Sequence, residues 1–514
     1  MVKYYLTTAI VYVNEAPGLH FLYEQIGSDA LARFHRQRGD DVYFLTGTDE
    51  NAAKNERAAK ERGEDTRASV DRLAARYKEA ARVYSISYDR FIRTTDPDHV
   101  RASQALVQKW IDNGDVYEGL YEGTYCGSCE AFYEESDLVD GHCPFHPDKE
   151  LQQLSERNYF FRLSKYEPAL RALYHGDPDF CVPETRRNEV LAWFDRGLRD
   201  ISISRRGQTW GVPFPGDPNH VIYVWFDALI NYLTGVGYGT DEAHFRKFWP
   251  ADLHVIGKDI TRFHCIYWPA MLLAAGIPLP KQVFAHGFLN YRGQRLSKTS
   301  GNMIDPFAAA VEWGADAVRY LLLRQVGFVS DGDVSPEIFT ARYNADLANN
   351  LGNLVQRTVA MIGRYCEGRV PEPSGTSRLR QVAERAVREH DDACARLAFD
   401  SSLAAAFSLV DATNKHYDDT KPWTLAKNGD RAVLGAALYD AAEAVRIVAN
   451  LLWPYLPETT AKIAEALGVE VPGPGGADRW RELVRWGALR PGSRVRPAPP
   501  LFPRIEAGEK AVAS

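Results

Sequence analysis

The sequence has no excess of basic residues and no long apolar run, and both absences limit what the protein can be. Its 514 residues include 61 lysines and arginines against 68 aspartates and glutamates, a net charge of −7. No overall positive field therefore attracts nucleic acid, and any RNA contact must use a local surface. No apolar stretch is long enough to span a bilayer, and the first residues lack the pattern of a signal peptide. We expect a cytoplasmic protein without membrane contact.

Cysteine is also scarce, and its distribution is uneven. There are seven cysteines, an odd number that argues against a disulfide framework in a chain of this length. Two pairs stand out, Cys126-x2-Cys129 and Cys143-x2-His146, with 13 residues between them. Four soft ligands in two closely spaced pairs suit tetrahedral Zn²⁺, and because no coordination position stays open, the predicted zinc is structural.

The order of apolar segments predicts an α/β protein. Strand patterns at residues 4–13 and 41–46 alternate with helical patterns at 22–38, 51–62 and 66–84. This alternation is typical of a parallel, doubly wound sheet. Strand patterns return near residues 220–236, 253–256 and 282–288, so the intervening stretch, rich in aromatics, glycine and proline, is interpreted as an insertion.

Helical periodicity dominates the rest of the chain and predicts a helical bundle. We divide the sequence into a first α/β half at 1–115, an insertion with the zinc knuckle at 116–220, a second α/β half at 221–334, a helical bundle at 335–470, and a Pro/Gly-rich strap at 471–514 that packs back. No further segment suited to oligomerisation follows the strap, so we expect a monomer.

Two short segments are candidates for nucleotide chemistry. The stretch NEAPGLHFLYE, residues 14–24, is a strand-to-helix turn, the place where α/β enzymes bind nucleotide phosphates. The stretch RLSKTSGN, residues 295–302, is a loop whose Lys298 suits phosphate charge that develops during a reaction. Alone, the second pattern is more typical of a solvated loop.

Many longer strings together resemble the class I aminoacyl-tRNA synthetases, and among them the methionyl-tRNA synthetases. They include TTAIVYVN, YFLTGTDE, RNEVLAWF, YVWFDALINYL, VIGKDITRFHCIYWPAML, RLSKTSGN and ADLANNLGNLVQR. The resemblance covers nearly the whole chain. It implies a Rossmann-type catalytic domain split by a zinc-bearing connective insertion, an anticodon-binding helical domain, ATP with Mg²⁺ as co-substrate, and methionine and tRNA(Met) as partners.

The resemblance also assigns residues to roles. It places the methionine pocket on Ile10, Tyr12, Asp49, Trp225, Leu229, Tyr232, Ile260 and His264, with Asp49 holding the substrate ammonium. In the turn Ile256–Asp259, Gly257 and Asp259 would contact ATP. Asn353, Arg357 and Trp423 would read a CAU anticodon, since stacking and hydrogen bonding to unstacked bases is how single-stranded loops are recognised.

The same resemblance fails at the first nucleotide signature. The family has His-Ile/Leu-Gly-His there, and this chain has Gly18-Leu19-His20-Phe21. Nearby, Asn51 replaces a histidine, and Arg295 replaces a lysine, although Lys298 is present. The missing histidines normally stabilise charge on the α-phosphate, and losing one such donor typically costs about 10²–10³ in rate. His20 and Arg295 are the candidates to supply that charge in their place.

Three functions stay open at this point. The first is a methionine–tRNA ligase with an altered ATP site, which the intact pocket and anticodon residues favour. The second is a paralogue that transfers an activated amino acid to a small acceptor such as an N-hydroxylated amino acid, with a cupin-type partner enzyme on the way to hydrazines. The third is a non-catalytic protein that binds an amino acid or tRNA.

Overall fold

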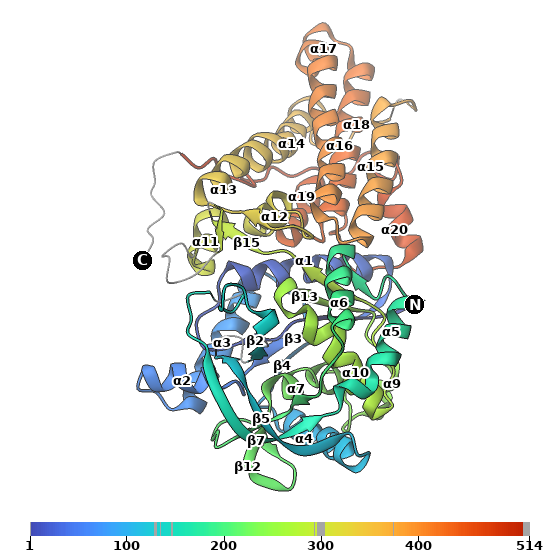
Figure 1. Ribbon diagram of the computed structural model, residues 1–514. Helices are drawn as coiled ribbons and strands as arrows, with labels where there is room; N and C mark the ends of the chain where they lie inside the picture. The colour runs from blue at the N-terminus through green and yellow to red at the C-terminus, as the bar shows by residue number, and fades with distance from the viewer. Residues whose placement is uncertain are drawn as a thin grey trace.

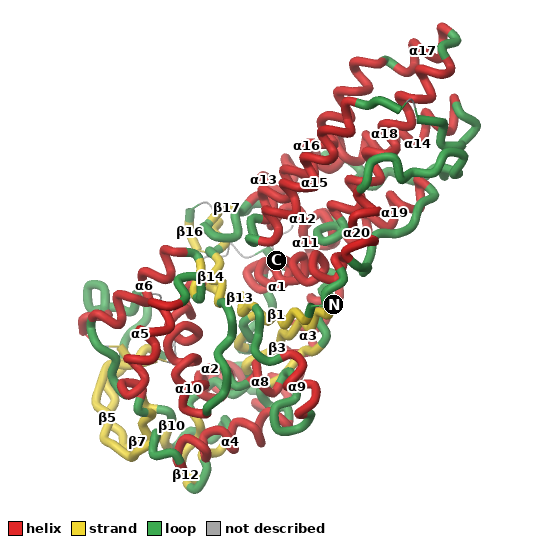
Figure 2. Tube along the Cα trace, turned by 90° about the vertical axis from the view of Figure 1, so that its right-hand side faces the viewer, coloured by secondary structure: helices red, strands yellow, loops and turns green. Residues whose placement is uncertain are grey.

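A computed structural model describes residues 2–127, 131–133, 135–144, 147–291, 293–295, 304–373 and 375–506, and for residues 121, 122, 131, 132, 136, 154, 156 and 295 only the backbone. The molecule is elongated, with an α/β part at one end and a helical bundle at the other (Figures 1 and 2). Among the described residues, no helix is long and apolar enough to cross a membrane.

A parallel sheet forms the centre of the α/β part. Its order is β2–β3–β1–β13–β14–β8, with β4 paired to β3, and every pairing is parallel. The strands are β1 Lys3–Thr8, β2 Val11–Tyr12, β3 Asp41–Asp49, β4 Arg90–Arg93, β8 Cys181–Val182, β13 Leu253–Gly257 and β14 Val283–His286. The predicted parallel α/β architecture is confirmed.

The strand expected over residues 4–13 is interrupted. β1 ends at Thr8, and β2 pairs only with the last residues of β3, Val11 with Thr48 and Tyr12 with Asp49. Ala9 still donates its N–H to the carbonyl of Val255 at 3.0 Å, after which the chain leaves β13. Because apolar residues continue through the interruption, the apolar pattern alone predicts one strand.

Helices connect the strands and link the sheet to the bundle. These are α1 Leu19–Arg38, α2 Ala53–Glu61, α3 Thr66–Val83, α4 Pro97–Asp112, α7 Val224–Ala228, α8 Asn231–Thr234, α9 Glu242–Phe248 and α10 Trp268–Ala275. Figure 1 shows α1 lying between the sheet and the bundle. It is therefore buried along most of its length.

A buried ion pair fixes α1 to the bundle. Arg319, fully buried on α12 (Ala315–Gln325), donates to Asp29 of α1 at 2.7 Å and to the carbonyls of Pro454 and Tyr455, both at 2.8 Å. Burial opposes the charge on Asp29, but Arg33 and Arg319 outweigh it and lower its pKa to about 2. One satisfied guanidinium thus joins three segments far apart in the sequence.

The insertion is mostly antiparallel. It contains a four-stranded sheet of β5 Val116–Cys126, β6 Ala131–Tyr133, β7 Gln152–Phe161 and β9 Ile201–Ser202, a three-stranded sheet of β10 Ser204–Arg206, β11 Pro213–Phe214 and β12 Asp217–Ile222, and the helices α5 Glu167–Gly176 and α6 Glu184–Asp195. Between these helices the chain returns to the central sheet, where β8 pairs with β14. The sequence analysis did not anticipate this, because a two-residue strand has no detectable period.

The C-terminal half is helical. It begins with β15 Leu289–Tyr291 and β16 Gln294–Arg295, which form a small sheet with β17 Gly332–Asp333. The helices α11 Pro306–Trp313 and α12 lie between β16 and β17 in the sequence. After β17 come α13 Pro336–Arg342, the π-helix Tyr343–Gly352, α14 Asn353–Tyr365, α15 Arg378–Ala395, α16 Phe399–Thr420, α17 Pro422–Asn428, α18 Arg431–Leu452, α19 Pro457–Leu467 and α20 Ala477–Val484. Beyond α20 the chain runs along the bundle, where Val370 donates its N–H to Ser493 and Tyr343 its hydroxyl to Pro503, both at 2.9 Å.

Candidate active site

A small pocket opens where β1, β3 and β13 end, the usual ligand edge of a parallel sheet. It is lined by Ala9, Ile10, Tyr12, Asp49, Trp225, Ala228, Leu229, Asn231, Tyr232, Ile260 and His264. All eight residues predicted for a substrate pocket are in this set. The interruption after β1 supplies Ile10, β2 ends on Tyr12 and β3 ends on Asp49. The remaining side chains come from α7, α8 and the short helical segments after β13.

The pocket wall is aromatic and polarisable. The rings of Tyr12 and Trp225 meet edge to face, with centroids 6.4 Å apart and planes at 80°. Behind Trp225, the ring of Phe263 is stacked at 3.7 Å and 7°. Such a wall suits an apolar or thioether side chain.

A hydrogen-bond chain fixes the state of His264. Its Nδ1 lies 3.0 Å from the carbonyl oxygen of Ile260, which can only accept, so Nδ1 carries the proton. Nε2 then accepts from the Tyr232 hydroxyl at 2.8 Å. Burial lowers the pKa of His264 to about 4, so the ring is neutral at physiological pH.

Asp49 places a carboxylate in the wall of this largely apolar pocket. It is only 3% exposed, and Asn55 donates to its backbone carbonyl at 2.9 Å, which holds the end of β3 against the start of α2. A buried carboxylate beside aromatic rings suits a primary ammonium group.

A second network, which the sequence analysis missed, holds the two pocket walls together. Asp227, fully buried on α7 between Trp225 and Leu229, accepts from Asn51 at 2.7 Å, and its other oxygen lies 3.0 Å from Nε2 of His99. Asn51 follows Asp49 closely, so this contact joins the wall of α7 to the end of β3. Only the tertiary structure reveals the partner of Asp227.

The neighbouring edge of the sheet carries the Gly257 turn and a buried acid–base pair. A Cβ on Gly257 would lie 2.8 Å from Oδ1 of Asp259, so the Asp259 carboxylate packs directly against this glycine. Nearby, His286 and Glu24 form a buried pair at 2.9 Å. Burial raises the pKa of Glu24. Burial also opposes the charged form of His286, but the hydrogen bond and charge of Glu24, the Gly287 carbonyl and the charge of Asp259 together raise its pKa. Neither residue was a sequence candidate.

Comparison with known proteins identifies the family. The family model "tRNA synthetases class I (M)" matches residues 4–152 and 146–359. Proteins named methionine--tRNA ligase from Clostridium acetobutylicum and Thermotoga maritima are each 44% identical over 99% and 98% of this chain, and the matches cover 79% and 81% of those proteins. The chain belongs to the methionyl-tRNA synthetase family of class I tRNA synthetases.

Solved structures from the same family superpose closely. Mycobacterium tuberculosis methionyl-tRNA synthetase in complex with methionyl-adenylate is 44% identical, with a TM-score of 0.93 over 98% of this chain and 100% of that one. The apo form of that enzyme gives 0.85, at 42% identity over 99% of each chain. The present structure is therefore closer in shape to that enzyme with adenylate than without it.

The altered family signature lies at the start of α1. Gly18 precedes the helix in extended backbone, and no side chain caps the helix. His20 is exposed on the first turn. Phe21 is 1% exposed and packs edge to face on Tyr77 of α3, with centroids 4.9 Å apart. Phe21 is thus part of the core, and His20 is the histidine left at the surface of this turn.

Some of the predicted site residues are not among the residues that the structure describes. Cys129, His146 and Lys298 lie outside the described residues, as does the side chain of Arg295. Of the predicted zinc ligands, Cys126 ends β5 and Cys143 follows in the knuckle, and both are fully buried. No cluster of three potential metal ligands occurs among the residues that the structure describes.

The predicted anticodon residues lie in the bundle. Asn353 and Arg357 are one turn apart on α14, and the Arg357 guanidinium lies 4.9 Å from the ring of Tyr417. Tyr417 is in the last turn of α16, directly before α17, which carries Trp423 at the far end of the bundle (Figures 1 and 2). Trp423 is 40% exposed, so part of its ring is accessible at this end of the bundle.

Proposed function

We propose that this protein is a methionine–tRNA ligase, which activates methionine with ATP as methionyl adenylate and transfers the methionyl group to tRNA(Met). The assembled pocket of eight family-matched residues is the observation that carries the proposal. Charging of tRNA takes place in the cytoplasm, where we expect the protein to work.

The pocket geometry suggests how methionine is held. The ammonium group pairs with Asp49, and the thioether lies against Tyr12 and Trp225. The substrate carboxylate then points toward the edge of the sheet that carries Gly257, Asp259 and Glu24. The ATP ribose would bind at this edge, because the side-chain carboxylates of Asp259 and Glu24 can accept hydrogen bonds from ribose hydroxyls.

In the first step the methionine carboxylate attacks the α-phosphorus of the ATP–Mg²⁺ complex. The new O–P bond forms as the bond to pyrophosphate breaks, and pyrophosphate leaves. Lys298, Arg295 and His20 are the groups that we propose to neutralise the developing charge. In the second step tRNA is selected by Asn353, Arg357 and Trp423 through its CAU anticodon. A hydroxyl of its 3′-terminal ribose forms an ester bond with the methionyl carbonyl carbon, the bond from that carbon to the phosphate oxygen breaks, AMP leaves, and the hydroxyl proton passes to the released phosphate or to water.

Amino-acid-dependent ATP–pyrophosphate exchange, followed by charging of tRNA(Met), tests this function. We expect exchange with methionine above all other amino acids, and a methionyl ester on tRNA. Exchange without charging, together with hydroxamate formation on small N-hydroxylated acceptors, would favour the small-acceptor paralogue. No exchange with any amino acid would contradict the ligase function.

The hydroxyl of Tyr232 should contribute to methionine affinity through His264. Tyr232→Phe removes the donor to Nε2 and leaves that buried nitrogen unsatisfied, so we expect methionine to bind about tenfold more weakly by calorimetry. His264 stays neutral above about pH 4, so the loss should be the same at pH 6 and pH 8. Tyr439→Phe, which loses a buried hydroxyl contact to Leu489, is the matched control. Unchanged affinity would contradict this role.

We also propose one structural Zn²⁺ held by Cys126, Cys129, Cys143 and His146. Burial of the two described thiols at the base of the knuckle fits metal ligation. Elemental analysis should give one zinc per chain, and Cys126→Ser should lose it and lower the melting temperature. Cys366→Ser, at a partly buried cysteine in the bundle, should retain it. A metal-free protein of full thermal stability would contradict the prediction.

We propose that the chain acts as a monomer. Light scattering should give a mass near the chain mass of 57.8 kDa. A value of about twice that mass would show a dimer.

A further inference from the structure

Asn51 stands where the family has a histidine, and the steps proposed above give it no role. It lies just after the end of β3 and is 7% exposed. Its amide nitrogen donates to the carbonyl of Thr94 at 3.0 Å and to Oδ2 of Asp227 at 2.7 Å. Thr94 follows β4 and Asp227 lies on α7, so one nitrogen ties the end of β3 to two other segments. A histidine ring nitrogen carries at most one proton and could not donate to both acceptors.

Asp227 is anchored a second time, from α4. Its Oδ1 lies 3.0 Å from Nε2 of His99, and Nδ1 of His99 lies 3.0 Å from the hydroxyl oxygen of Thr234. All three residues are buried. Because water does not reach these groups, a carboxylate that loses a partner here stays unsatisfied, and the partners therefore determine where Asp227 lies.

Asp227 faces away from the methionine pocket. Trp225 and Leu229, which both line the pocket, are four residues apart and share one face of the helix, whereas Asp227 lies between them on the opposite face. Since α7 has only five residues, it has few backbone hydrogen bonds of its own, and its place depends on the contacts of its side chains. The position of Asp227 is thus passed on to the pocket wall.

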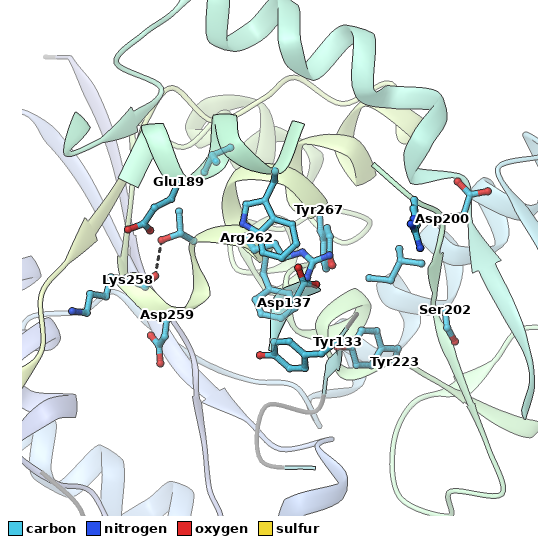
Figure 3. A pocket seen from close by; sticks show the side chains of 16 residues that line it. Tyr133, Asp137, Glu189, Asp200, Ser202, Tyr223, Lys258, Asp259, Arg262 and Tyr267 are labelled. Carbon is cyan, nitrogen blue, oxygen red and sulfur yellow. Dashed lines mark hydrogen bonds between the residues drawn. The ribbon is translucent and has the colours of Figure 1, made fainter. Parts of the chain in front are cut away.

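The Trp225 wall is not backed by packed core. Behind it, the ring of Phe263 is stacked at 3.7 Å and lines a cavity of about 300 Å³ between the insertion, α6 and the segments after β13 (Figure 3). A ring that borders a cavity lacks packing partners on that side, so it can shift without compressing its neighbours. Stacking alone therefore does not fix the width of the methionine pocket.

We propose that Asn51 and Asp227 are a positioning pair that sets the width of the methionine pocket and, with it, the selectivity for side-chain length. The inference rests on the proposed ligase function. Neither residue lines the pocket. The pair holds the α7 wall against the end of β3, where Asp49 binds the substrate ammonium, so the separation of these two walls determines how long a side chain fits.

Selectivity between methionine and ethionine, which is one methylene longer, tests the pair. One extra methylene in a fixed apolar pocket is worth about 10–200-fold in kcat/KM, and we expect this preference for methionine in wild-type pyrophosphate exchange. Asn51→Ala frees the α7 wall and should reduce the preference by about tenfold, with little change in the KM for ATP. The ratio of two kcat/KM values does not depend on the fraction of folded enzyme, so general destabilisation leaves it unchanged.

A reciprocal exchange separates this contact from other effects of mutation. Asn51→Asp alone brings two carboxylates together at the 2.7 Å contact and should also lose selectivity. Asn51→Asp combined with Asp227→Asn re-forms the hydrogen bond in the reverse direction and should recover part of the ratio, since only the bond to Thr94 stays lost. Asn450→Ala is the matched control, because this buried amide donates to the carbonyl of Arg446 at 2.9 Å within the bundle. Its ratio should equal that of the wild type.

Calorimetric binding of methionine and ethionine gives the corresponding ratio without catalysis, so the pair and the ligase function are tested separately. If methionine binds but supports no exchange, the ligase function fails, and the ratio of dissociation constants still decides the role of the pair. Equal binding of the two amino acids by the wild type, an unchanged ratio in Asn51→Ala, or no recovery in the reciprocal variant would overturn the positioning role.

Discussion

Replacing His20 by alanine is expected to lower the rate of methionine-dependent pyrophosphate exchange by about 10²–10³-fold, the effect of losing one donor to developing oxyanion charge. His20 is exposed on the first turn of α1, at the strand-to-helix turn where the family signature lies, whereas Phe21 is buried against Tyr77. His20 is thus the histidine of this turn that remains accessible to a nucleotide. Exchange should be measured at saturating methionine and ATP, so that the loss reports on the chemical step.

His175→Ala is the control, because His175 is also exposed but lies on α5 in the insertion.

A second variant tests whether His20 assists the adenylation step or obstructs nucleotide binding. Gly18→His combined with His20→Gly restores part of the family pattern, and the φ of −122° at Gly18 is one that any residue adopts. Phe21 should be left in place, since a histidine there would lose the packing on Tyr77 and place a polar ring in the core, at a cost of about 2–4 kcal/mol. Faster exchange in the double variant than in the wild type would contradict a catalytic His20.

Replacing Asp49 by asparagine is expected to lower kcat/KM for methionine by about 10²–10³-fold, because truncating one partner of a buried charge pair costs about 2–5 kcal/mol. Asp49 is 3% exposed in the pocket wall, so water cannot substitute for the lost charge. Asparagine keeps the shape of the side chain, so the loss is attributable to charge. The KM for ATP should change little, since the nucleotide edge is built by other residues.

Asp316→Asn provides the matched control. Asp316 is 7% exposed and accepts from the Thr459 backbone at 2.6 Å, within the helical part of the chain. Its replacement also removes a buried charge but should leave methionine kinetics within about threefold. A similar loss in both variants would indicate general destabilisation, and an unchanged Asp49→Asn would exclude this residue as the partner of the ammonium group.

Local patterns in the sequence were sufficient to predict the class of fold. The alternation of strand and helix over the first residues predicted the parallel sheet, and helical periodicity predicted the bundle, which includes the long helix α18, Arg431–Leu452. The spacing of apolar residues reports which side of an element is buried, and that information is local. The resemblance of longer strings then identified eight residues that line one pocket although they come from positions 10 to 264.

Only the tertiary structure determined which buried groups meet. In the sequence, Asp227 is a single acidic residue among apolar neighbours. In the structure it contacts Asn51 and His99, which belong to segments that the sequence alone does not show to be adjacent. The same is true of Glu24 with His286, and of β8, whose two residues enter the central sheet from within the insertion. Phe21 matches a position where the family has a polar residue, yet packing on Tyr77 makes it part of the core. Sequence periodicity indicates that a side chain is buried, whereas its partner depends on distances between chain segments, which only the folded arrangement of sheet, insertion and bundle determines.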